Sequence, residues 1–240
     1  MSVVRVPARV PYGAGLEWQR RLARARIDGR LSRDLLLLLE HEPVVTVGRG
    51  VRSEEVRSRV GGAVEGIPRF EIERGGDMTY HGPGQLVGYP ILDLHGYRQD
   101  LHWYVRRLEG SLIEALEELG LHAFRVAGYT GVWVGDPLSG PIAAEGMRKI
   151  ASIGVHVSRW VTWHGFALNV TGEALGPFGG IVPCGIAGVR MTSLETEGAV
   201  WAGDEVARAV SSGFARAFGA RLEMSELAEL EEAGLGLVAE

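Results

Sequence analysis

The sequence predicts a single domain of the α/β class, in which a mixed sheet is flanked by helices. Strand-like runs occur on both sides of one long amphipathic helix, and a second amphipathic helix lies near the C-terminus. No internal repeat or linker divides the 240 residues, so we treat residues 1–240 as one domain. A chain of this length can bury roughly 70 to 75% of its unfolded surface. Strands and helices in this order form a sheet covered by helices.

The first part of the chain is expected to form a helix and then short strands. Apolar residues recur at helical spacing in residues 16–27, and Gly29 follows them as a stop signal. Runs that are rich in β-branched residues or that alternate in polarity predict strands at residues 35–39, 44–47, 70–73 and 86–94. Residues 50–66 mix charged residues with glycine, which indicates a loop.

The second part begins with the strongest helix signal in the chain. Apolar positions follow the helical period from Asp100 until Gly120 closes the segment. Strands are expected at residues 130–134, 150–157 and 162–170, a further amphipathic helix at 204–218, and a terminal helix after Ala220.

Composition excludes several classes of protein. The apolar fraction is 46%, the charged fraction 23% and the formal net charge −5, which is typical of a soluble globular protein and not of one that coats nucleic acid. The longest apolar run, residues 35–39, is far too short to cross a bilayer. We expect a cytoplasmic monomer that binds neither nucleic acid nor membrane. A lone cysteine fits a reducing compartment without requiring one.

One lysine and one cysteine stand out. Lys149 is the single lysine among 25 basic residues, and Cys184 is the single cysteine. Arginine cannot lose a proton near neutral pH, so a position that remains lysine points to proton chemistry. Plainer explanations exist: codon bias with a surface lysine, a small buried cysteine, or the avoidance of heat-labile residues in a thermophile.

A glycine-rich segment and two strands offer the surroundings for this chemistry. Residues 74–85 place glycine and proline between strands, where the backbone can approach a ligand closely; a glycine-rich hairpin is the alternative. If strands 150–157 and 162–170 pair antiparallel, we expect Lys149 and His164 near the same sheet edge, with a loop bringing Cys184 over it. An ammonium about 4 Å from a thiol contributes on the order of 4 kcal/mol of attraction to the thiolate, the form that attacks acyl groups.

Four ordered motifs resemble the lipoyl(octanoyl) transferases, over about residues 34–218. They are Arg74-Gly75-Gly76-Asp77-Met78-Thr79-Tyr80-His81 with Gly84-Gln85, then Lys149-Ile150-Ala151-Ser152-Ile153-Gly154, then His164-Gly165-Phe166-Ala167-Leu168-Asn169, and then Pro183-Cys184-Gly185-Ile186. The resemblance implies the catalytic fold of lipoate and biotin protein ligases. It also implies that octanoyl moves from acyl carrier protein to Cys184, and then to a lysine of a lipoyl domain. Lys149 is then the partner that lowers the pKa of the thiol and later accepts a proton.

The resemblance further implies the residues of the acyl site and the partners. The acyl site comprises Arg74, Gly75, Gly76, Asp77, Met78, Thr79, Tyr80, His81, Ser152, Ile153, Gly154, Gly165, Phe166 and Ala167, with His164 and Asn169 in support. Phe166 stands where an aliphatic residue is expected, and we expect it to narrow one wall. No cofactor is expected, because phosphopantetheine arrives on the donor carrier protein. The acceptors are E2 subunits of 2-oxoacid dehydrogenases and the glycine cleavage H protein.

Three other hypotheses remain. An ATP-dependent lipoate ligase would share the fold and the lysine but would not need Cys184, and the chain has no phosphate-binding loop motif of the G-x-x-x-x-G-K-[ST] type. A non-catalytic module that only binds a carrier protein is the second. The third is a metal site of His81, His164 and Cys184, for which the spacing gives no support. The remaining histidines, His41, His95, His102, His122 and His156, are expected at the surface or in structural roles, and Asp77 can be a turn former.

Overall fold

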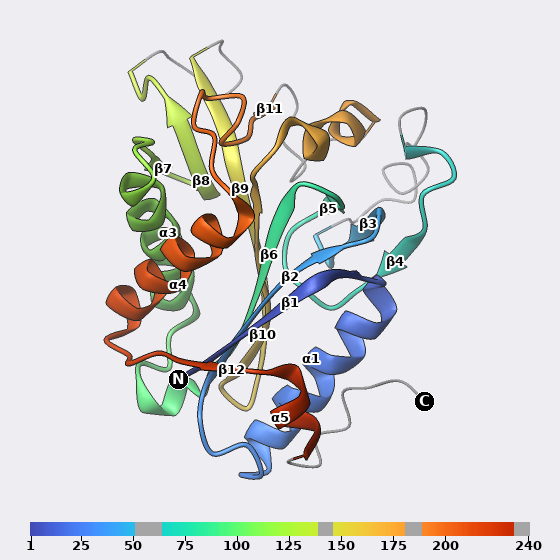
Figure 1. The fold of residues 1–240 in the computed structure, drawn as a ribbon, viewed down its shortest axis with the longest axis vertical. Coiled ribbons are helices and arrows are strands. Elements are labelled where there is room, and N and C mark those ends of the chain that lie inside the picture. The colour runs from blue at the N-terminus through green and yellow to red at the C-terminus, as the bar shows by residue number, and fades with distance from the viewer. Residues whose placement is uncertain (51–63, 139–145, 181–188, 233–240) are drawn as a thin grey trace.

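The computed structural model describes residues 1–50, 64–138, 146–180 and 189–232. In these ranges a nine-stranded mixed sheet runs through the molecule in the order β12-β1-β2-β6-β10-β9-β8-β7, with β11 paired to β9 (Figure 1). Its strands are β1 (Ser2–Val10), β2 (Leu35–His41), β6 (Gln85–Ile91), β7 (Phe124–Val126), β8 (Tyr129–Gly135), β9 (Met147–Ser158), β10 (Val161–Asn169), β11 (Arg190–Met191) and β12 (Glu223–Ser225). A smaller sheet, β4-β3-β5, comprises β3 (Val44–Val47), β4 (Arg69–Glu71) and β5 (Met78–His81).

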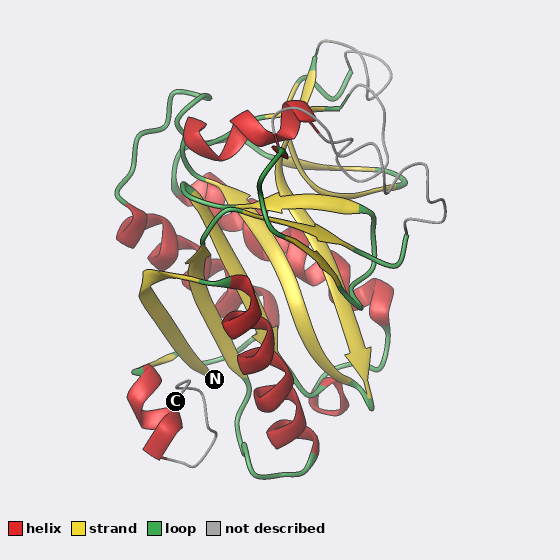
Figure 2. Ribbon diagram, turned by 90° about the vertical axis from the view of Figure 1, so that its right-hand side faces the viewer, coloured by secondary structure: helices red, strands yellow, loops and turns green. Residues whose placement is uncertain are grey.

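Helices cover both faces of the large sheet. Helix α1 (Tyr12–Ile27) lies on one face, and α3 (Leu101–Glu118) and α4 (Gly203–Phe218) lie on the other (Figure 2). Asp100 caps α3, because its side chain accepts a hydrogen bond from the backbone N–H of Trp103. Shorter elements complete the chain: η2 (Leu94–Gly96), η3 (Gly172–Gly180) and α5 (Leu227–Glu232).

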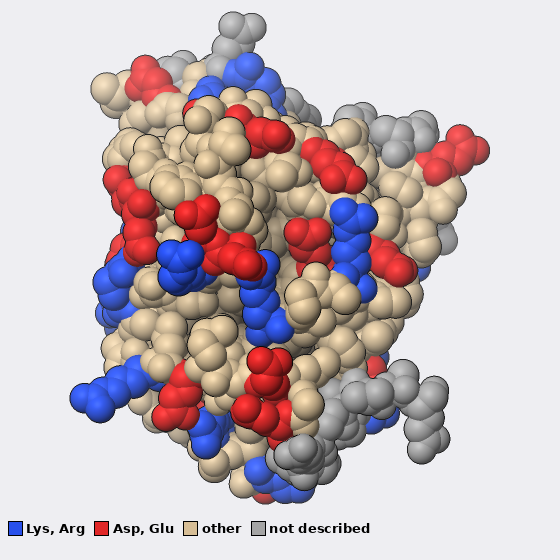
Figure 3. Space-filling view, in the orientation of Figure 1, with Lys and Arg blue, Asp and Glu red and all other residues tan. Residues whose placement is uncertain are grey.

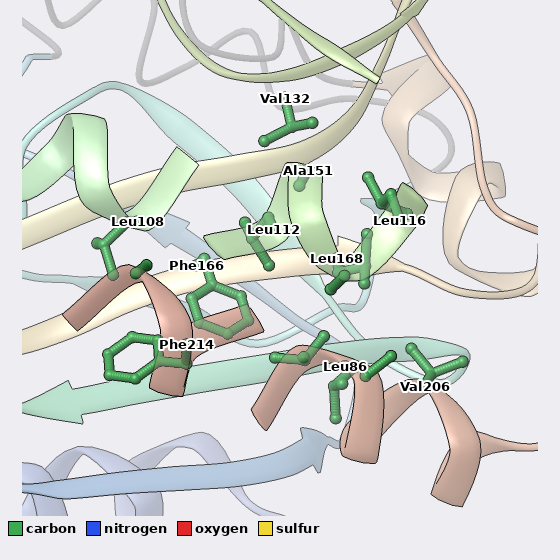
Figure 4. Packing of buried hydrophobic residues seen from close by; sticks show 14 of the residues in the cluster. Leu86, Leu108, Leu112, Leu116, Val132, Ala151, Phe166, Leu168, Val206 and Phe214 are labelled. Atoms are coloured by element: carbon green, nitrogen blue, oxygen red, sulfur yellow. The ribbon is translucent and has the colours of Figure 1, made fainter. Parts of the chain in front are cut away.

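Each face of the sheet has its own apolar core. Phe166 and Leu168 of β10 pack with Leu112 of α3 and Phe214 of α4 on one face (Figure 4). On the other face, Ala167 belongs to the cluster that contains side chains of α1 and β2. Successive residues of β10 therefore point into different cores, as the alternation of a strand requires. Both faces are buried here, so residues 165–168 of β10 include no polar side chain.

The predicted mixed α/β class is confirmed, and the long strands and helices lie close to the expected positions. The first helix starts earlier than predicted, at Tyr12, and β9 and β10 pair antiparallel, which was the condition for placing Lys149 and His164. Strands β1 and β5 were not predicted from sequence. Strand β1 was missed because its alternation is broken by arginines and proline, and β5 because it lies inside the glycine-rich segment. The tail forms the short strand β12 before α5. Residues 51–63 of the expected loop lie outside the described residues.

The surface carries charges of both signs. Acidic and basic side chains are interspersed over the face shown in Figure 3, with no large area of one sign. On this face the basic side chains do not cluster into the patch that is typical of nucleic-acid binding. Across the described ranges, no helix combines the length and apolar character that crossing a membrane requires.

Candidate active site

A narrow slot lies where β5, β9 and β10 meet the segment that follows β4. It encloses about 470 Å³ of unfilled space, counted with the solvent at its mouth. All of the expected acyl-site residues line it except Gly75 and Tyr80. His164 lines it too, as do Tyr12 and Tyr89, two residues that sequence reasoning missed. Neither tyrosine lies in a motif, so only the fold brings them to the slot.

Two paired glycines allow the slot to form. Gly154 of β9 and Gly165 of β10 lie opposite each other. A Cβ on Gly165 would collide with the carbonyl oxygen of Gly88, and one on Gly154 would lie 2.9 Å from Arg74 Cδ. Both positions thus need glycine because the neighbouring backbone or side chain occupies the space of a Cβ. Because Gly154 has no side chain, the segment around Arg74 can lie directly on strand β9.

Arg74 fastens this segment to the small sheet. Its Nη2 donates to the carbonyl oxygen and to Oγ1 of Thr46 on β3, both at 2.9 Å. The backbone N–H of Gly75 donates to the carbonyl oxygen of Val155 at 3.0 Å. Because Arg74 is buried, these charge-assisted bonds give the slot a rigid wall. Tyr80, in contrast, packs against Phe178 at a ring distance of 6.0 Å, in a separate apolar cluster.

Lys149 is buried, with only 1% of its surface exposed. Strand β9 carries a bulge here: Val132 pairs with Ala151 and the next residue, Trp133, pairs with Lys149, so Ile150 is the extra residue. Ile150 and Ala151 both belong to the core beneath α3 and α4. The Lys149 ammonium instead lies 5.4 Å from the centre of the Trp133 ring, on the opposite face. The bulge therefore turns Lys149 toward the face that carries the slot.

The expectation that Lys149 and His164 lie near the same sheet edge is wrong. Within the antiparallel pair, His164 is opposite Val155, six residues along β9 from Lys149, and Leu168 is opposite Ala151. At about 3.3 Å per residue, the two side chains start roughly 20 Å apart along the sheet. Both strands also lie in the sheet interior. Asn169, and not His164, lies at the Lys149 end.

His164 occupies the far end of the slot under strain. Its φ of 56° is unusual for a residue inside a strand. Its backbone N–H donates a hydrogen bond to Oε1 of Gln19 at 2.9 Å. A side chain thus satisfies this buried backbone group, which the unusual φ turns away from the neighbouring strands. Burial lowers the pKa of His164, so the ring is neutral at pH 7. Its Nε2 has no hydrogen-bond partner in the described part of the chain.

Glu73 faces His164 and was not predicted from sequence. One carboxylate oxygen lies 3.9 Å from His164 Nε2, too far for a hydrogen bond. Arg20 donates two hydrogen bonds to the carboxylate, at 3.1 and 3.0 Å, and Trp163 donates one at 3.1 Å. The hydrogen bonds from Arg20 and Trp163 hold the pKa of Glu73 well below its usual range. Glu73 is thus an anion at one end of the slot.

Phe166 lines the slot, but its ring packs elsewhere. The ring lies over Gly88, where a Cβ would collide with it, and belongs to the core beneath α3 and α4. Figure 4 shows the ring between Leu112 and Phe214. The ring is therefore placed to fill the core on the face opposite Ala167.

Cys184 lies outside the described residues. Before it, η3 ends at Gly180; after it, the chain returns as β11, where Met191 pairs with Lys149. The backbone N–H of Thr192 donates to the carbonyl oxygen of Lys149 at 3.0 Å. The segment that carries Cys184 thus rejoins the sheet beside Lys149. Among the residues that the structure describes, no group of three His, Cys, Asp or Glu side chains could hold a metal ion.

The fold and site define a class of proteins built on the catalytic domain of lipoate protein ligases. The structure of a bipartite lipoate protein ligase from Thermoplasma acidophilum superimposes with a TM-score of 0.70 at 17% identity, covering 100% of this chain and 97% of that one. Residues 11–215 match the model of the lipoyl protein ligase A/B catalytic domain.

The chain belongs to this lipoyl protein ligase A/B family. It is 48% identical over 221 residues to an octanoyltransferase of Gloeobacter violaceus, covering 92% of each chain. An octanoyltransferase of Acidobacterium capsulatum is 50% identical over 197 residues, covering 79% of this chain and 77% of that one. These matches confirm the resemblance seen in the motifs and the expected class of enzyme, an acyltransferase.

Proposed function

We propose that residues 1–240 form one catalytic domain that moves an octanoyl group from acyl carrier protein to Cys184 and then to a lysine of a lipoyl domain. The relatives named octanoyltransferases support octanoyl transfer as a step of protein lipoylation. The observation that carries the residue assignment is the bulge that turns a buried Lys149 toward the slot face, beside the strand at which the Cys184 segment rejoins the sheet.

In the first half-reaction, the Cys184 thiolate attacks the thioester carbonyl and displaces the carrier thiolate, which takes a proton from the Lys149 ammonium. The buried ammonium of Lys149 favours the thiolate, since a nearby positive charge in a site of low dielectric stabilises an anion. Backbone N–H groups of the glycine-rich wall can hold the developing oxyanion. The acyl chain occupies the slot, where Met78 and Ile153 offer apolar contacts.

In the second half-reaction, the amine of the acceptor lysine attacks the Cys184 thioester. The C–N bond forms as the C–S bond breaks, Cys184 leaves as the thiolate, and the amine gives one proton to the neutral Lys149 amine, which becomes an ammonium again. Lys149 thus stabilises the thiolate in the first half-reaction and accepts the proton of the amine in the amide-forming step.

Intact-mass spectrometry tests this function. Incubation with octanoyl carrier protein should add one octanoyl group without ATP, and Cys184→Ser should abolish the adduct. An adduct that appears only with ATP and free acid would indicate a lipoate ligase, and carrier-protein binding without an adduct would indicate a non-catalytic module.

The finer assignments are part of the proposal. The acceptors are E2 subunits of 2-oxoacid dehydrogenases and the glycine cleavage H protein, and the enzyme works in the cytoplasm as a monomer. No cofactor is required, because the donor supplies the activated thioester. Addition of EDTA should therefore leave the rate of octanoyl transfer unchanged.

A further inference from the structure

A chain of side-chain amides links the slot to the strand of Lys149. It begins at the carbonyl oxygen of Thr192, to which Asn169 Nδ2 donates at 2.9 Å. The backbone N–H of the same Thr192 donates to the carbonyl oxygen of Lys149. Because a carbonyl oxygen can only accept, the orientation of the Asn169 amide is fixed, and Oδ1 must face the other way.

Gln85 continues the chain with its own orientation fixed. Its Nε2 donates to Asn169 Oδ1 at 2.9 Å and to the carbonyl oxygen of Tyr80 at 3.3 Å. Both partners are acceptors, so the nitrogen of this amide must lie on their side. Gln85 Oε1 is left facing Nδ1 of His81 at 2.8 Å. An amide oxygen cannot donate, so Nδ1 of His81 carries a hydrogen.

The His81 ring is neutral, which leaves a lone pair on Nε2. His81 lines the slot, and only 7% of the residue is exposed. Burial is the main cause that lowers the pKa of His81 well below its usual range. The neighbouring His41, Arg74 and His164 lower this pKa further, whereas the hydrogen bond with Gln85 raises it. Gln85 is the partner of the ring among the described residues. Nε2 can therefore accept a hydrogen bond, and no described residue donates one to it.

The two amides lie toward the Lys149 end of the paired strands, and the His81 ring that they hold lies 6.1 Å from the Tyr12 ring and 5.9 Å from the His41 ring. Gln85 and Asn169 lie opposite each other on β6 and β10, one step beyond the pair of Leu168 with Ala151. Gln85 and Asn169, the two amides between His81 and the strand beside Lys149, thus lie side by side on paired strands. His164, by contrast, lies near the other end of the paired segment.

We propose that Gln85 and Asn169 hold His81 as the tautomer with a free lone pair at Nε2, and that this nitrogen accepts a hydrogen bond from the amine of the incoming acceptor lysine. An acyl carbonyl oxygen is itself an acceptor and is repelled at this point, whereas an amine N–H fits. The assignment of the amine rests on the proposed function. The assignment of the tautomer does not rest on the proposed function, because it follows from the hydrogen bonds of the free protein.

The tautomer is tested on the free full-length protein by two-bond ¹H–¹⁵N correlation spectra of ¹⁵N-histidine-labelled material. The His81 signals, identified as those lost in His81→Gln, should show a protonated Nδ1 and an unprotonated Nε2 at pH 7. A protonated Nε2 overturns the proposal. Gln85→Glu should raise the pKa of His81, because it puts a negative charge beside Nδ1. Gln99→Glu, the same change at an exposed position, should leave it unchanged.

The role of the nitrogen is tested by separating the two half-reactions. His81→Phe and Asn169→Asp should slow amine attack on octanoyl-Cys184 by about tenfold, the effect of one lost hydrogen bond, while octanoylation of Cys184 changes much less. Equal slowing of both steps, or wild-type transfer, overturns the amine assignment. If the wild-type tautomer is as expected but no octanoyl transfer occurs at all, the proposed function fails and the tautomer stands.

Discussion

The side chain of Lys149 occupies the space that a side chain on Gly131 would need. The two residues lie on neighbouring strands β9 and β8, and a Cβ on Gly131 would be 2.5 Å from Lys149 Cε and 3.1 Å from Nζ. The backbone N–H of Gly131 donates to the buried carboxylate of Glu109 on α3 at 3.1 Å, which holds the strand in place. The absence of a side chain at residue 131 is therefore part of how Lys149 is oriented.

Gly131→Ala should displace Lys149 and reduce octanoyl transfer by at least about tenfold. Its φ of 127° is unfavourable for alanine, and the new Cβ would meet both Lys149 and the carbonyl oxygen of Ala151. Gly128→Ala is the matched control, because its φ is also positive, at 80°, but its Cβ would meet nothing within 4 Å. Similar activity of the two variants, measured at equal folded fraction, would contradict the role of Gly131.

Lys149→Arg should separate the two half-reactions. Arginine keeps the positive charge, so Cys184 should still be acylated at a reduced rate, but a guanidinium cannot accept and release a proton near neutral pH. Transfer to a lipoyl-domain lysine should fall by about 10² to 10⁴. Lys149→Met, which removes the charge, should impair both steps. Rapid-quench kinetics measure each step, and near-wild-type transfer by the arginine variant would mean that Lys149 supplies charge alone.

Substitutions at Met78 of β5 and at Phe166 of β10 should have different effects on the preferred acyl chain length. Burial of about 0.8 kcal/mol per methylene gives roughly fourfold discrimination per carbon until the slot is full. Met78→Ala enlarges the slot and should shift the preference in a C4 to C12 thioester series toward longer chains. Phe166→Leu should leave the preference unchanged and lower the free energy of unfolding by about 1 to 3 kcal/mol, because the ring packs in the core. A shift caused by Phe166→Leu would show that the ring bounds the acyl chain.

Buried His41 should make the fold sensitive to mild acid. Burial lowers its pKa from 6.5 to about 4. Its Nδ1 lies 2.8 Å from the carbonyl oxygen of Val10 and its Nε2 2.6 Å from the Tyr89 hydroxyl. The unfolded chain takes up a proton below pH 6.5 and the folded protein only near pH 4, so stability is complete above 6.5 and falls between these values. A shift of this size corresponds to about 3 kcal/mol.

Urea unfolding at pH 7.0, 5.5 and 4.5 measures this loss. His41→Gln should flatten the pH dependence of the unfolding free energy, whereas His102→Gln, at an exposed position, should not. The same slope in wild type and His41→Gln would exclude His41 as a source of the acid sensitivity.

Much of the secondary structure was predictable because its signals are local. The helix after Asp100 has a cap, a helical period and a closing glycine, and the structure places it at Leu101–Glu118. Strands β1 and β12 have no comparable signal, since each is defined by its partner in the sheet. Strands β9 and β10 do pair antiparallel, which was the condition set from the sequence. The position of His164 relative to Lys149 was predicted wrongly, because register depends on the turn and the cores on both faces.

The sequence by itself determined the family, the mixed α/β class and most of the slot residues, because these depend on motifs and on local periodicity. Tertiary structure alone decided that a bulge at Ile150 turns Lys149 toward the slot face, and that Tyr12 and Tyr89 join the slot. It also decided that the Phe166 ring fills the core and that Asn169 and Gln85 fix the His81 tautomer. Each of these depends on which atoms meet across strands far apart in the chain, and no local pattern encodes that.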